Sequence, residues 1–442
     1  MQPITRLTGT NIIDCAAMNV YEAAKERISL IFDDFDNIVV SFSGGKDSGV
    51  VLNMAIDEAR KRGRRIGVFF IDLEAWYKKS VEFIERMFDN NKDVLDPYWI
   101  CLPMKSDNSL SYFEPYWIWW EVGKENIWVR PIPKRKCVIN LDNNPFDFYR
   151  ENMTFEEFVK YIGNWYGKGG KTACLLGIRT AESLNRYRAM VMDKETYKGK
   201  RWSTHVCRDT WNFYPIYDWS VEDVWVYNGK FGKDYNRLYD LFYKAGVSIH
   251  KMRVDEPFGD TCKAGLNLFK VVEPDTWSRV ANRVSGANMG ALYNHNKMMN
   301  ANYTLPKGHT WKTFTEFLLD TLPKETADHY RVKFYKFAKY WKEVGCGLTE
   351  KEIQILETKY PEHIVNTHKT NNRGKKDKEV ILFKDIVDEI AELDTKCELL
   401  TWKRMAMCII KNDYLCTRLN FSVTKDLSMR QKQLVEKYKT IL

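Results

Sequence analysis

The chain has 442 residues, 44% of them hydrophobic and 29% charged, and its formal net charge is +9 at pH 7. This composition excludes a disordered chain, and the length allows two or three domains. No segment approaches the roughly 18 apolar residues of a membrane span, the N-terminus lacks a signal peptide's pattern, and the ten cysteines contain no Cys-x-x-Cys pair. We therefore expect a cytoplasmic protein with reduced thiols and no membrane partner, whose mild positive charge permits a nucleic-acid partner without requiring one.

The first predicted elements surround a glycine-rich turn. A helix over residues 20–32 precedes residues 37–42, whose β-branched and apolar content is typical of a buried strand. A second helix over residues 47–62 has a basic C-terminal end and Gly63 as its stop. The turn between them consists of Ser43, Gly44, Gly45, Lys46, Asp47 and Ser48.

This turn has the features of an anion site. Its glycines let the backbone approach a ligand, and the free N–H groups at the start of the following helix point at a phosphate. Ser43 and Ser48 can donate hydroxyl protons to phosphate oxygens, and Lys46 supplies a charge. Asp47 either holds Mg²⁺ or orders the loop. The glycine spacing differs from that of a P-loop, but the strand–turn–helix setting still predicts a nucleotide site.

Residues 65–72 and 75–90 repeat the order of strand and helix, and residues 98–104 are a candidate third strand. This alternation predicts a doubly wound parallel sheet, in which ligands bind beyond the carboxyl ends of the strands. Asp72 closes the second strand. It therefore contacts the nucleotide, a metal ion or the incoming substrate, or it is a structural cap.

An irregular segment over residues 112–130 contains four tryptophans, and we expect it to pack on the sheet rather than to form a base-stacking platform. The basic residues 134–136 follow and lie directly before Cys137. Cations near a thiol lower its pKa in principle, although an unreactive cysteine on an exposed loop is the simpler interpretation.

A second cationic group follows a predicted strand over residues 171–179. Three arginines surround one carboxylate at the end of this strand, an arrangement that grips phosphate or sulfate, although a solvated helix face would look similar. The residues concerned are Gly177, Arg179, Glu182, Arg186 and Arg188. Capping boxes begin helices at Thr154 and at Ser220.

Four motifs occur in a fixed order in the first part of the chain. They are the loop at 43–48, the strand end Phe-Phe-Ile-Asp at 69–72, the block over 177–188 and the segment Pro-Ile-Tyr-Asp-Trp-Ser-Val-Glu-Asp-Val-Trp at 215–225. This series, over about residues 25–265, resembles the phosphoadenosine phosphosulfate (PAPS) reductase family of the adenine nucleotide alpha-hydrolase fold. The whole chain, including residues 255–263, looks like the subgroup typified by the immunoglobulin-binding regulator A protein of bacterial prophages.

Two departures from the reductases bear on the reaction. Members that reduce PAPS lack the loop lysine and carry a C-terminal Glu-Cys-Gly-Ile-His nucleophile, whereas this chain keeps Lys46 and lacks that ending. The resemblance therefore implies the ATP-using branch, whose PP-loop enzymes cleave ATP to AMP and pyrophosphate and adenylylate a substrate, here in sulfur transfer or nucleic-acid modification. A non-catalytic nucleotide-binding regulator is the alternative. A reductase with Cys137 or Cys262 as reactive thiol is third.

The resemblance also implies roles for individual residues. The expected catalytic residues are Lys46, Asp72, Arg179 and Arg186. The expected nucleotide-binding residues are Ser43, Gly44, Gly45, Lys46, Asp47, Ser48, Gly177, Arg179, Glu182 and Arg188, with Mg²⁺ at Asp47. An iron–sulfur cluster on Cys137, Cys207, Cys262 and Cys346 is conceivable, but their spacing does not support one.

The alternation of strand and helix stops near residue 271. We expect a lead-in over 1–24, a nucleotide-binding domain over 25–270 and a mainly helical domain over 271–442. Its helices are predicted at 276–299, 311–322, 324–344, 350–357, 380–393 and 400–411. Basic segments at 133–136, 194–201 and 366–378 are either solvated charge or contacts to a polyanion. A partner protein from a neighbouring gene is expected in either case.

Overall fold

The computed structural model describes residues 18–111, 113–183, 186–187, 190, 194–259, 265–287, 305–370, 378–393 and 399–421. The chain forms two compact units. Unit 1 comprises residues 1–104, 119–256 and 268–277, and unit 2 comprises residues 105–118, 257–267 and 278–442. Within the described residues, no helix is long and apolar enough to cross a membrane.

Unit 1 is built on a seven-stranded sheet with the order β6-β3-β2-β1-β7-β9-β8. All neighbours are parallel except β8 and β9, which pair antiparallel. The strands are β1 (Asn37–Ser41), β2 (Ile66–Ile71), β3 (Leu95–Ile100), β6 (Val138–Ile139), β7 (Thr172–Leu176), β8 (Ser203–Cys207) and β9 (Thr210–Phe213). Two further strands, β4 (Met104–Asp107) and β5 (Tyr116–Trp119), form a separate pair, most of whose residues belong to unit 2.

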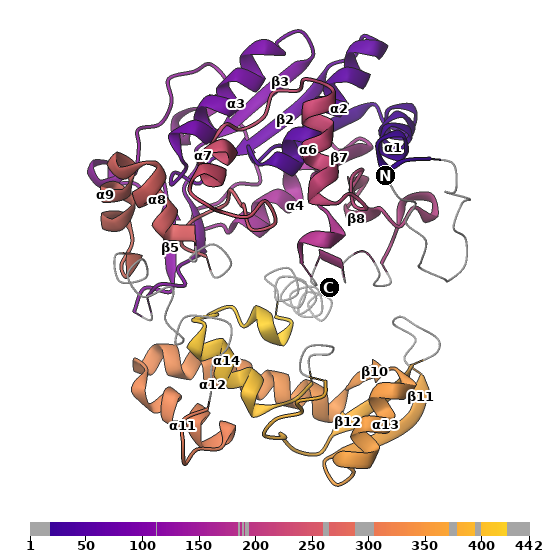
Figure 1. Cartoon of the computed structure of the whole chain (residues 1–442), viewed down its shortest axis with the longest axis vertical. Coiled ribbons are helices and arrows are strands. Elements are labelled where there is room, and N and C mark those ends of the chain that lie inside the picture. Colours follow the sequence, from indigo (N-terminus) through magenta and orange to yellow (C-terminus); the bar gives the residue numbers. More distant parts are fainter. Residues whose placement is uncertain are drawn as a thin grey trace, which may run out of the picture. The chain divides into compact units, whose positions relative to one another are not determined.

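Helices connect and flank these strands (Figure 1). They are α1 (Val20–Asp34), α2 (Lys46–Arg62), α3 (Lys78–Asn90), α4 (Phe155–Tyr166), α6 (Val221–Lys230) and α7 (Leu238–Lys244). Helices α8 (Leu266–Val272) and α9 (Pro274–Arg283) are divided between the two units. The predicted capping boxes at Thr154 and Ser220 are both present. The predicted doubly wound α/β fold is confirmed.

The centre of the sheet decides where a ligand can bind. From β1 the chain crosses through α2 to β2 on one side, and β7 later pairs with β1 on the other side. The connections therefore diverge at the carboxyl ends of β1 and β7, which is the switch point where open α/β sheets bind ligands. Helix α2 packs on β1 and β7 and contacts α1 and α6, so its first eleven residues are all buried.

The aromatic segment near residues 112–130 is divided between the two units, and the part from Trp119 onward belongs to the unit that holds the large sheet. Trp117, Trp119 and Trp120 are buried, and they are not available for stacking on a base. In unit 1, the buried Glu74 carboxylate accepts the backbone N–H groups of Trp120 at 2.8 Å and of Val129 at 2.9 Å. This carboxylate holds the segment that follows Trp119 against the edge of the sheet.

Unit 2 combines helices with a small sheet. Its helices are α11 (Trp311–Thr321), α12 (Lys324–Glu343), α13 (Glu350–Lys359) and α14 (Trp402–Ile410). Its strands β10 (Cys346–Leu348), β12 (Glu379–Phe383) and β11 (Ile364–Thr370) form an antiparallel sheet in that order. A core that includes Tyr330, Trp341, Ile381 and Phe383 joins the helices to this sheet.

The predicted helix over residues 380–393 is wrong. Residues 379–383 form β12, the central strand of this sheet, and residues 384–393 are irregular. The error has a physical cause: the apolar residues from Val380 to Leu393 recur at three- and four-residue intervals, so their spacing fits a helix as well as a buried strand. Pairing on both edges decides in favour of the strand. The predicted helix over 276–299 ends at Arg283 as α9, and its last residues lie outside the described part of the chain.

Candidate functional site

The glycine-rich turn joins β1 to α2 at the centre of the sheet. Gly45 is the N-cap of α2, and Gly44 has φ +70°, a conformation that favours glycine. The carbonyl of Gly44 accepts from the side-chain amide of Asn236 at 2.9 Å, and the same amide donates to Ser80. Asn236, from a distant part of the chain, therefore holds the turn in place directly before the first residue of α2.

The two serines of the turn lie side by side. Their hydroxyl oxygens are 3.0 Å apart, and the Ser48 hydroxyl also donates to the Gly45 carbonyl at 3.2 Å. The Ser43 hydroxyl accepts from the Gly45 N–H at 3.4 Å. The two hydroxyls thus lie together along the turn, and their role as phosphate donors stays a prediction.

Two cations share one carboxylate at the start of α2. Lys46 Nζ lies 3.0 Å from Asp47 Oδ2, and Arg179 Nε donates to Asp47 Oδ1 at 2.6 Å. All three side chains are buried: Lys46 is 6% exposed and Arg179 3%. Among these three groups one positive charge is in excess, and the N-terminus of α2 adds to it. The site is suited to an anion.

Gly177 explains how β7 approaches the turn. A Cβ atom at this position would lie 2.5 Å from the backbone nitrogen of Ser48 and 2.6 Å from the carbonyl carbon of Asp47. Both neighbours are backbone atoms that cannot rotate away. Only glycine lets the end of β7 pass this close, and this contact brings Arg179 onto Asp47.

The remaining predicted cations are arranged differently. Arg186 forms an ion pair with Glu182, and the Glu182 carbonyl accepts from Arg253 at 2.9 Å. The Arg186 side chain is 40% exposed, and its described ion-pair partner is Glu182 rather than a residue of the turn. Arg188 lies outside the described residues. Of the described arginines in the predicted cluster, Arg179 is the one that contacts the turn.

Asp72 lies at the carboxyl end of β2, as predicted, but its carboxylate is completely buried. Both of its oxygens are ion-paired with Arg130, Oδ2 also accepts from the indole of Trp99 at 2.6 Å, and Oδ1 accepts from the backbone of Glu74 at 3.0 Å. A carboxylate with this many internal donors has no free position for a ligand. The arrangement favours the structural alternative for Asp72 over a catalytic role.

The residues at Asp47 do not fit a magnesium ion in this arrangement, because both carboxylate oxygens are engaged by cations. Over the whole described part of the chain, no group of three or more His, Cys, Asp or Glu side chains converges as metal ligands would. The described cysteines Cys137, Cys207 and Cys346 belong to no such group, whereas Cys262 lies outside the described residues.

Cys137 does not have the environment of an activated thiol. Burial raises the pKa of this thiol, and its neighbour Arg135 offsets that rise only in part. Arg135 is itself ion-paired with Asp89 and Glu85. The cations before Cys137 in the sequence therefore do not produce the low pKa that a nucleophile needs.

Three site residues are not evident from any motif. Asn236 and Tyr239 contact the turn from the segment that begins α7, and Arg130 neutralises Asp72. Each lies more than fifty residues from its partner. The one available signal was the cluster of polar and aromatic residues at 235–240, which includes the start of the short helix α7.

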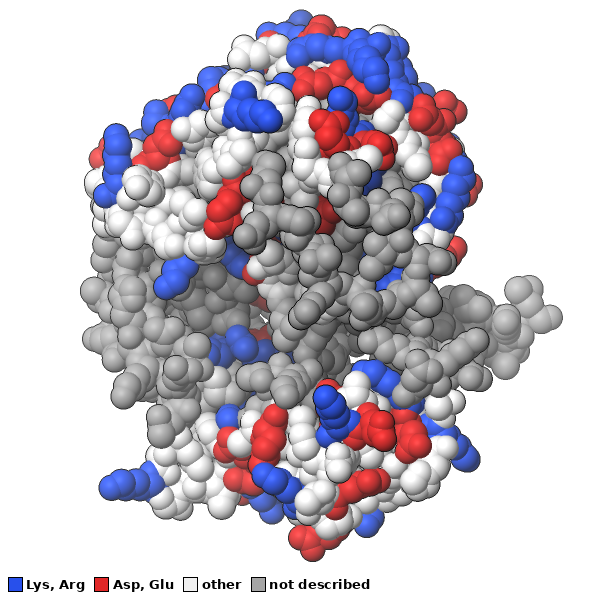
Figure 2. All heavy atoms as spheres, turned by 45° about the vertical axis from the view of Figure 1, so that its right-hand side comes forward, with Lys and Arg blue, Asp and Glu red and all other residues white. Residues whose placement is uncertain are grey.

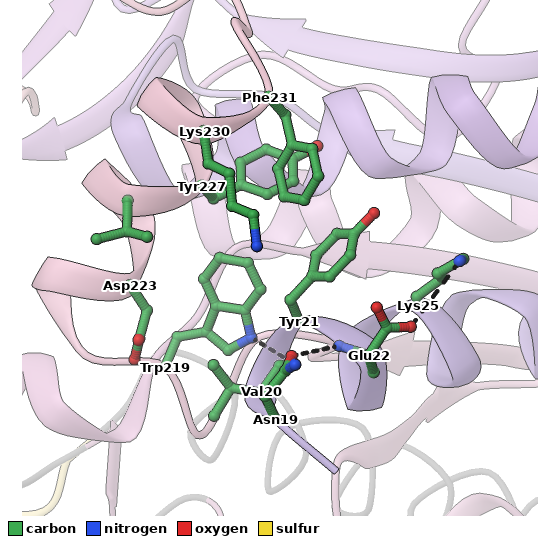
Figure 3. Close-up of a pocket in the computed structure, with 11 residues that line it drawn as sticks. Asn19, Val20, Tyr21, Glu22, Lys25, Trp219, Asp223, Tyr227, Lys230 and Phe231 are labelled. Carbon is green, nitrogen blue, oxygen red and sulfur yellow. Dashed lines mark hydrogen bonds and ion pairs between the residues drawn. The ribbon is translucent and has the colours of Figure 1, made fainter. Parts of the chain in front are cut away.

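A hollow of about 340 Å³ lies between the start of α1 and α6 (Figure 3). Its wall includes Trp219, whose indole donates to the Val20 carbonyl at 3.0 Å, with Tyr21 and Lys230 nearby. The carbonyl of Trp219 accepts from Arg179 at 3.4 Å. This residue therefore helps to orient the arginine of the anion site.

The sequence is 33% identical over 420 residues to the uncharacterized protein YbdN of Escherichia coli strain K12, and the alignment covers 92% of each chain. The chain belongs to the YbdN family. Within this family member, residues 37–96 and 128–246 match the phosphoadenosine phosphosulfate reductase domain, which confirms the resemblance seen in the motifs. Residues 246–430 match DUF3440, a domain of unknown function.

Two solved structures show a weaker similarity to this YbdN-family chain. The PAPS reductase of Candida auris, solved as a phosphate complex, is 16% identical and aligns over 50% of this chain and 84% of its own, with a TM-score of 0.26. The NH3-dependent NAD synthetase of Campylobacter jejuni is 11% identical and aligns over 65% of this chain and 100% of its own, also with a TM-score of 0.26.

Proposed function

We propose that the protein is an ATP-binding PP-loop enzyme that cleaves ATP to AMP and pyrophosphate and adenylylates a substrate. One observation carries this proposal: a serine-lined turn at the N-terminus of α2, against which β7 places a buried arginine. The match to a domain family that handles adenylylated sulfate points to the same class of ligand.

The charges of the site support phosphate binding. Lys46 and Arg179 are buried with a single carboxylate between them, and a buried charge is costly unless it is paired. A phosphate oxygen would balance the excess and would accept from the serine hydroxyls. Catalysis at such a site is mainly positioning and charge neutralisation, with no need for a protein nucleophile.

The proposed reaction uses these groups to hold the leaving pyrophosphate. The turn and Lys46 would hold the β- and γ-phosphates, which leaves the α-phosphate exposed. An oxygen of the acceptor attacks the α-phosphorus, the Pα–O bond to the β-phosphate breaks, and pyrophosphate leaves with the bonding electron pair. We further propose that Arg186, whose side chain is 40% exposed, meets an incoming anionic group. Mg²⁺ would enter as part of the ATP complex.

The acceptor is the least constrained element of the proposal. Sulfur transfer and nucleic-acid modification both fit an adenylylated intermediate, and we expect a partner protein from a neighbouring gene to take part. The visible face in Figure 2 carries positive and negative side chains interspersed, and in the basic segment at 194–201 Lys198 is ion-paired with Asp34.

The test is the fate of the α-phosphate. Purified protein is incubated with [α-³²P]ATP and Mg²⁺, alone and with the products of neighbouring genes. We expect labelled AMP or a labelled adenylylated acceptor, with pyrophosphate in equal amount. Labelled ADP with inorganic phosphate would contradict the proposal.

A second candidate function is nucleotide binding without turnover. It is favoured by the engagement of both Asp47 oxygens, which leaves the described site without a free carboxylate. Calorimetry with ATP, PAPS and AMP, followed by the turnover assay, distinguishes the two functions. Tight binding without products under every partner condition supports the regulator. The reductase alternative is disfavoured at Cys137, whose raised pKa opposes thiolate formation.

A further inference from the structure

Tyr239 lies directly over the start of α2. Its ring is buried, with 3% of the residue exposed, and packs edge-on against Trp225 and Phe242. Its hydroxyl oxygen accepts the backbone N–H of Lys46 at 3.0 Å, and the Lys46 ammonium lies 5.7 Å from the ring centroid. A Cβ atom on Gly45 would be 3.7 Å from the same hydroxyl. The hydroxyl is thus part of the wall of the turn.

The proton of this hydroxyl is not used within the described residues. The oxygen serves as an acceptor for Lys46, but none of the described groups accepts the hydroxyl proton in return. Burial raises the pKa of Tyr239, so the group stays protonated at neutral pH and keeps a donor to offer. A buried donor of this kind normally has an acceptor.

The position of the ring is fixed by the neighbouring residue Asn236. Its amide donates to the Gly44 carbonyl and to the Ser80 hydroxyl, while its own oxygen accepts from the Leu238 N–H at 3.0 Å. The segment that begins α7 is therefore tied to the turn at two points. These contacts already place the Tyr239 hydroxyl against the turn, so ligand binding would not require α7 to move.

We propose that Tyr239 is a phosphate-binding residue that donates its hydroxyl proton to the terminal phosphates of a nucleoside triphosphate held in the turn. This inference rests on the proposed function, because it concerns the same site and adds one hydrogen-bond donor to it. The donor set for these phosphates then includes the hydroxyls of Ser43 and Ser48, the Lys46 ammonium and the Tyr239 hydroxyl. The ligand class is an inorganic or nucleotide polyphosphate.

Tyr235 provides a matched control. It lies four residues earlier in the same segment, and its hydroxyl donates to Asp240 at 2.9 Å rather than to the turn. The variants Tyr239→Phe and Tyr235→Phe each remove one hydroxyl and keep the ring. Calorimetry with pyrophosphate, ATP and AMP on the full chain, together with thermal melting, measures the effect of each.

We expect Tyr239→Phe to weaken pyrophosphate and ATP binding about ten- to hundredfold, because a hydrogen bond to a charged group is lost. AMP binding should not change in either variant, and Tyr235→Phe should bind all three ligands as the unmodified protein does. A loss of affinity for pyrophosphate and ATP but not for AMP distinguishes this role from a general loss of folded structure, which would weaken the binding of all three ligands.

Three outcomes would overturn the inference. Unchanged or tighter pyrophosphate binding by Tyr239→Phe would mean that the hydroxyl only occupies the place of a phosphate oxygen. An equal loss in Tyr235→Phe would assign the effect to the segment. If Lys46→Ala loses pyrophosphate and Tyr239→Phe does not, this inference fails alone, whereas absence of binding by the unmodified protein removes the proposed function with it.

Discussion

The carboxyl ends of two neighbouring strand pairs differ in whether their charged side chains are balanced by protein partners. At β1 and β7, Lys46 and Arg179 share the single carboxylate of Asp47, and the serine hydroxyls bond chiefly to each other. At β2 and β3, the Asp72 carboxylate is saturated by Arg130, Trp99 and backbone. Both ends hold charged side chains at the edge where α/β sheets bind ligands.

The difference shows why strand-end position alone does not identify a catalytic residue. A charged group is available for chemistry only when its neighbours leave its hydrogen-bonding capacity unfilled or its charge unbalanced. The β1–β7 end has an excess of positive charge, whereas the Asp72–Arg130 pair is neutral. We therefore propose that the β1–β7 end binds the ligand and that the Asp72–Arg130 pair stabilises the fold.

Asp72→Asn should have the largest effect on stability. It removes one partner of a buried ion pair and leaves Arg130 uncompensated, which costs about 3–5 kcal/mol. Urea unfolding measures this loss. The matched control is Asp96→Asn, whose ion pair with Arg65 is exposed and contributes about 0–1 kcal/mol.

The same pair of variants checks the assignment of roles. The folded fraction of Asp72→Asn should bind ATP nearly as tightly as the unmodified protein. A stable Asp72→Asn protein with abolished nucleotide binding would reverse the assignment and return this carboxylate to the active site.

Lys46→Ala should have the largest effect on turnover. Loss of a preorganised charge at developing phosphate charge costs about 10²–10³ in rate. Lys61→Ala makes the same change on the same helix, at an exposed position near its C-terminal end, and should leave the rate unchanged. The measurement is the rate of pyrophosphate release by each variant. Equal rates for Lys46→Ala and Lys61→Ala would be incompatible with ligand binding at the turn.

Gly177→Ala should destabilise the protein by about 1–3 kcal/mol, because the added methyl group meets the backbone of Ser48 and Asp47. Gly229→Ala is the control: it lies in α6 with no atom within 4 Å of the added group, and it should stabilise by about 0.5–1 kcal/mol. Thermal melting gives both values. A neutral Gly177→Ala would show that β7 does not approach the turn this closely.

The smallest effect concerns the thiols. Because burial raises the pKa of Cys137, its thiolate fraction at pH 7.5 is below that of an ordinary cysteine. We expect slow alkylation by iodoacetamide, which accelerates as the pH rises, and faster alkylation of the exposed Cys346. Peptide mapping by mass spectrometry compares the two sites. Faster reaction at Cys137 would restore it as a candidate nucleophile.

The predictions made from the sequence succeeded where the determining contacts are local. The turn, its strand and its helix follow from residues 37–62 alone, because glycine content, apolar runs and helix termini act within a few residues. The contact between Arg179 and Asp47 was anticipated only as a shared site. This contact depends on the pairing of β7 with β1, two strands that are far apart in the sequence. A parallel sheet was predicted, and the carboxyl ends of its strands meet at one edge, so the contact was compatible with the prediction.

The features that the sequence did not predict depend on contacts between distant residues. The burial of Asp72 depends on Arg130, and the cover over the turn depends on Tyr239, almost two hundred residues away. In unit 2, the assignment of residues 379–383 to a strand depends on pairing with β10 and β11 on both edges. Such contacts leave no periodic signal in the segment itself.

The central claim is that the triphosphate of ATP binds at the carboxyl ends of β1 and β7. A crystal structure with α,β-methylene-ATP, which resists cleavage between the α- and β-phosphates, tests it most directly. We predict density for the β- and γ-phosphates at the N-terminus of α2, within hydrogen-bond reach of the Ser43 and Ser48 hydroxyls and the Lys46 ammonium. Nucleotide bound elsewhere, with the Lys46–Asp47–Arg179 contacts unchanged, would contradict the account.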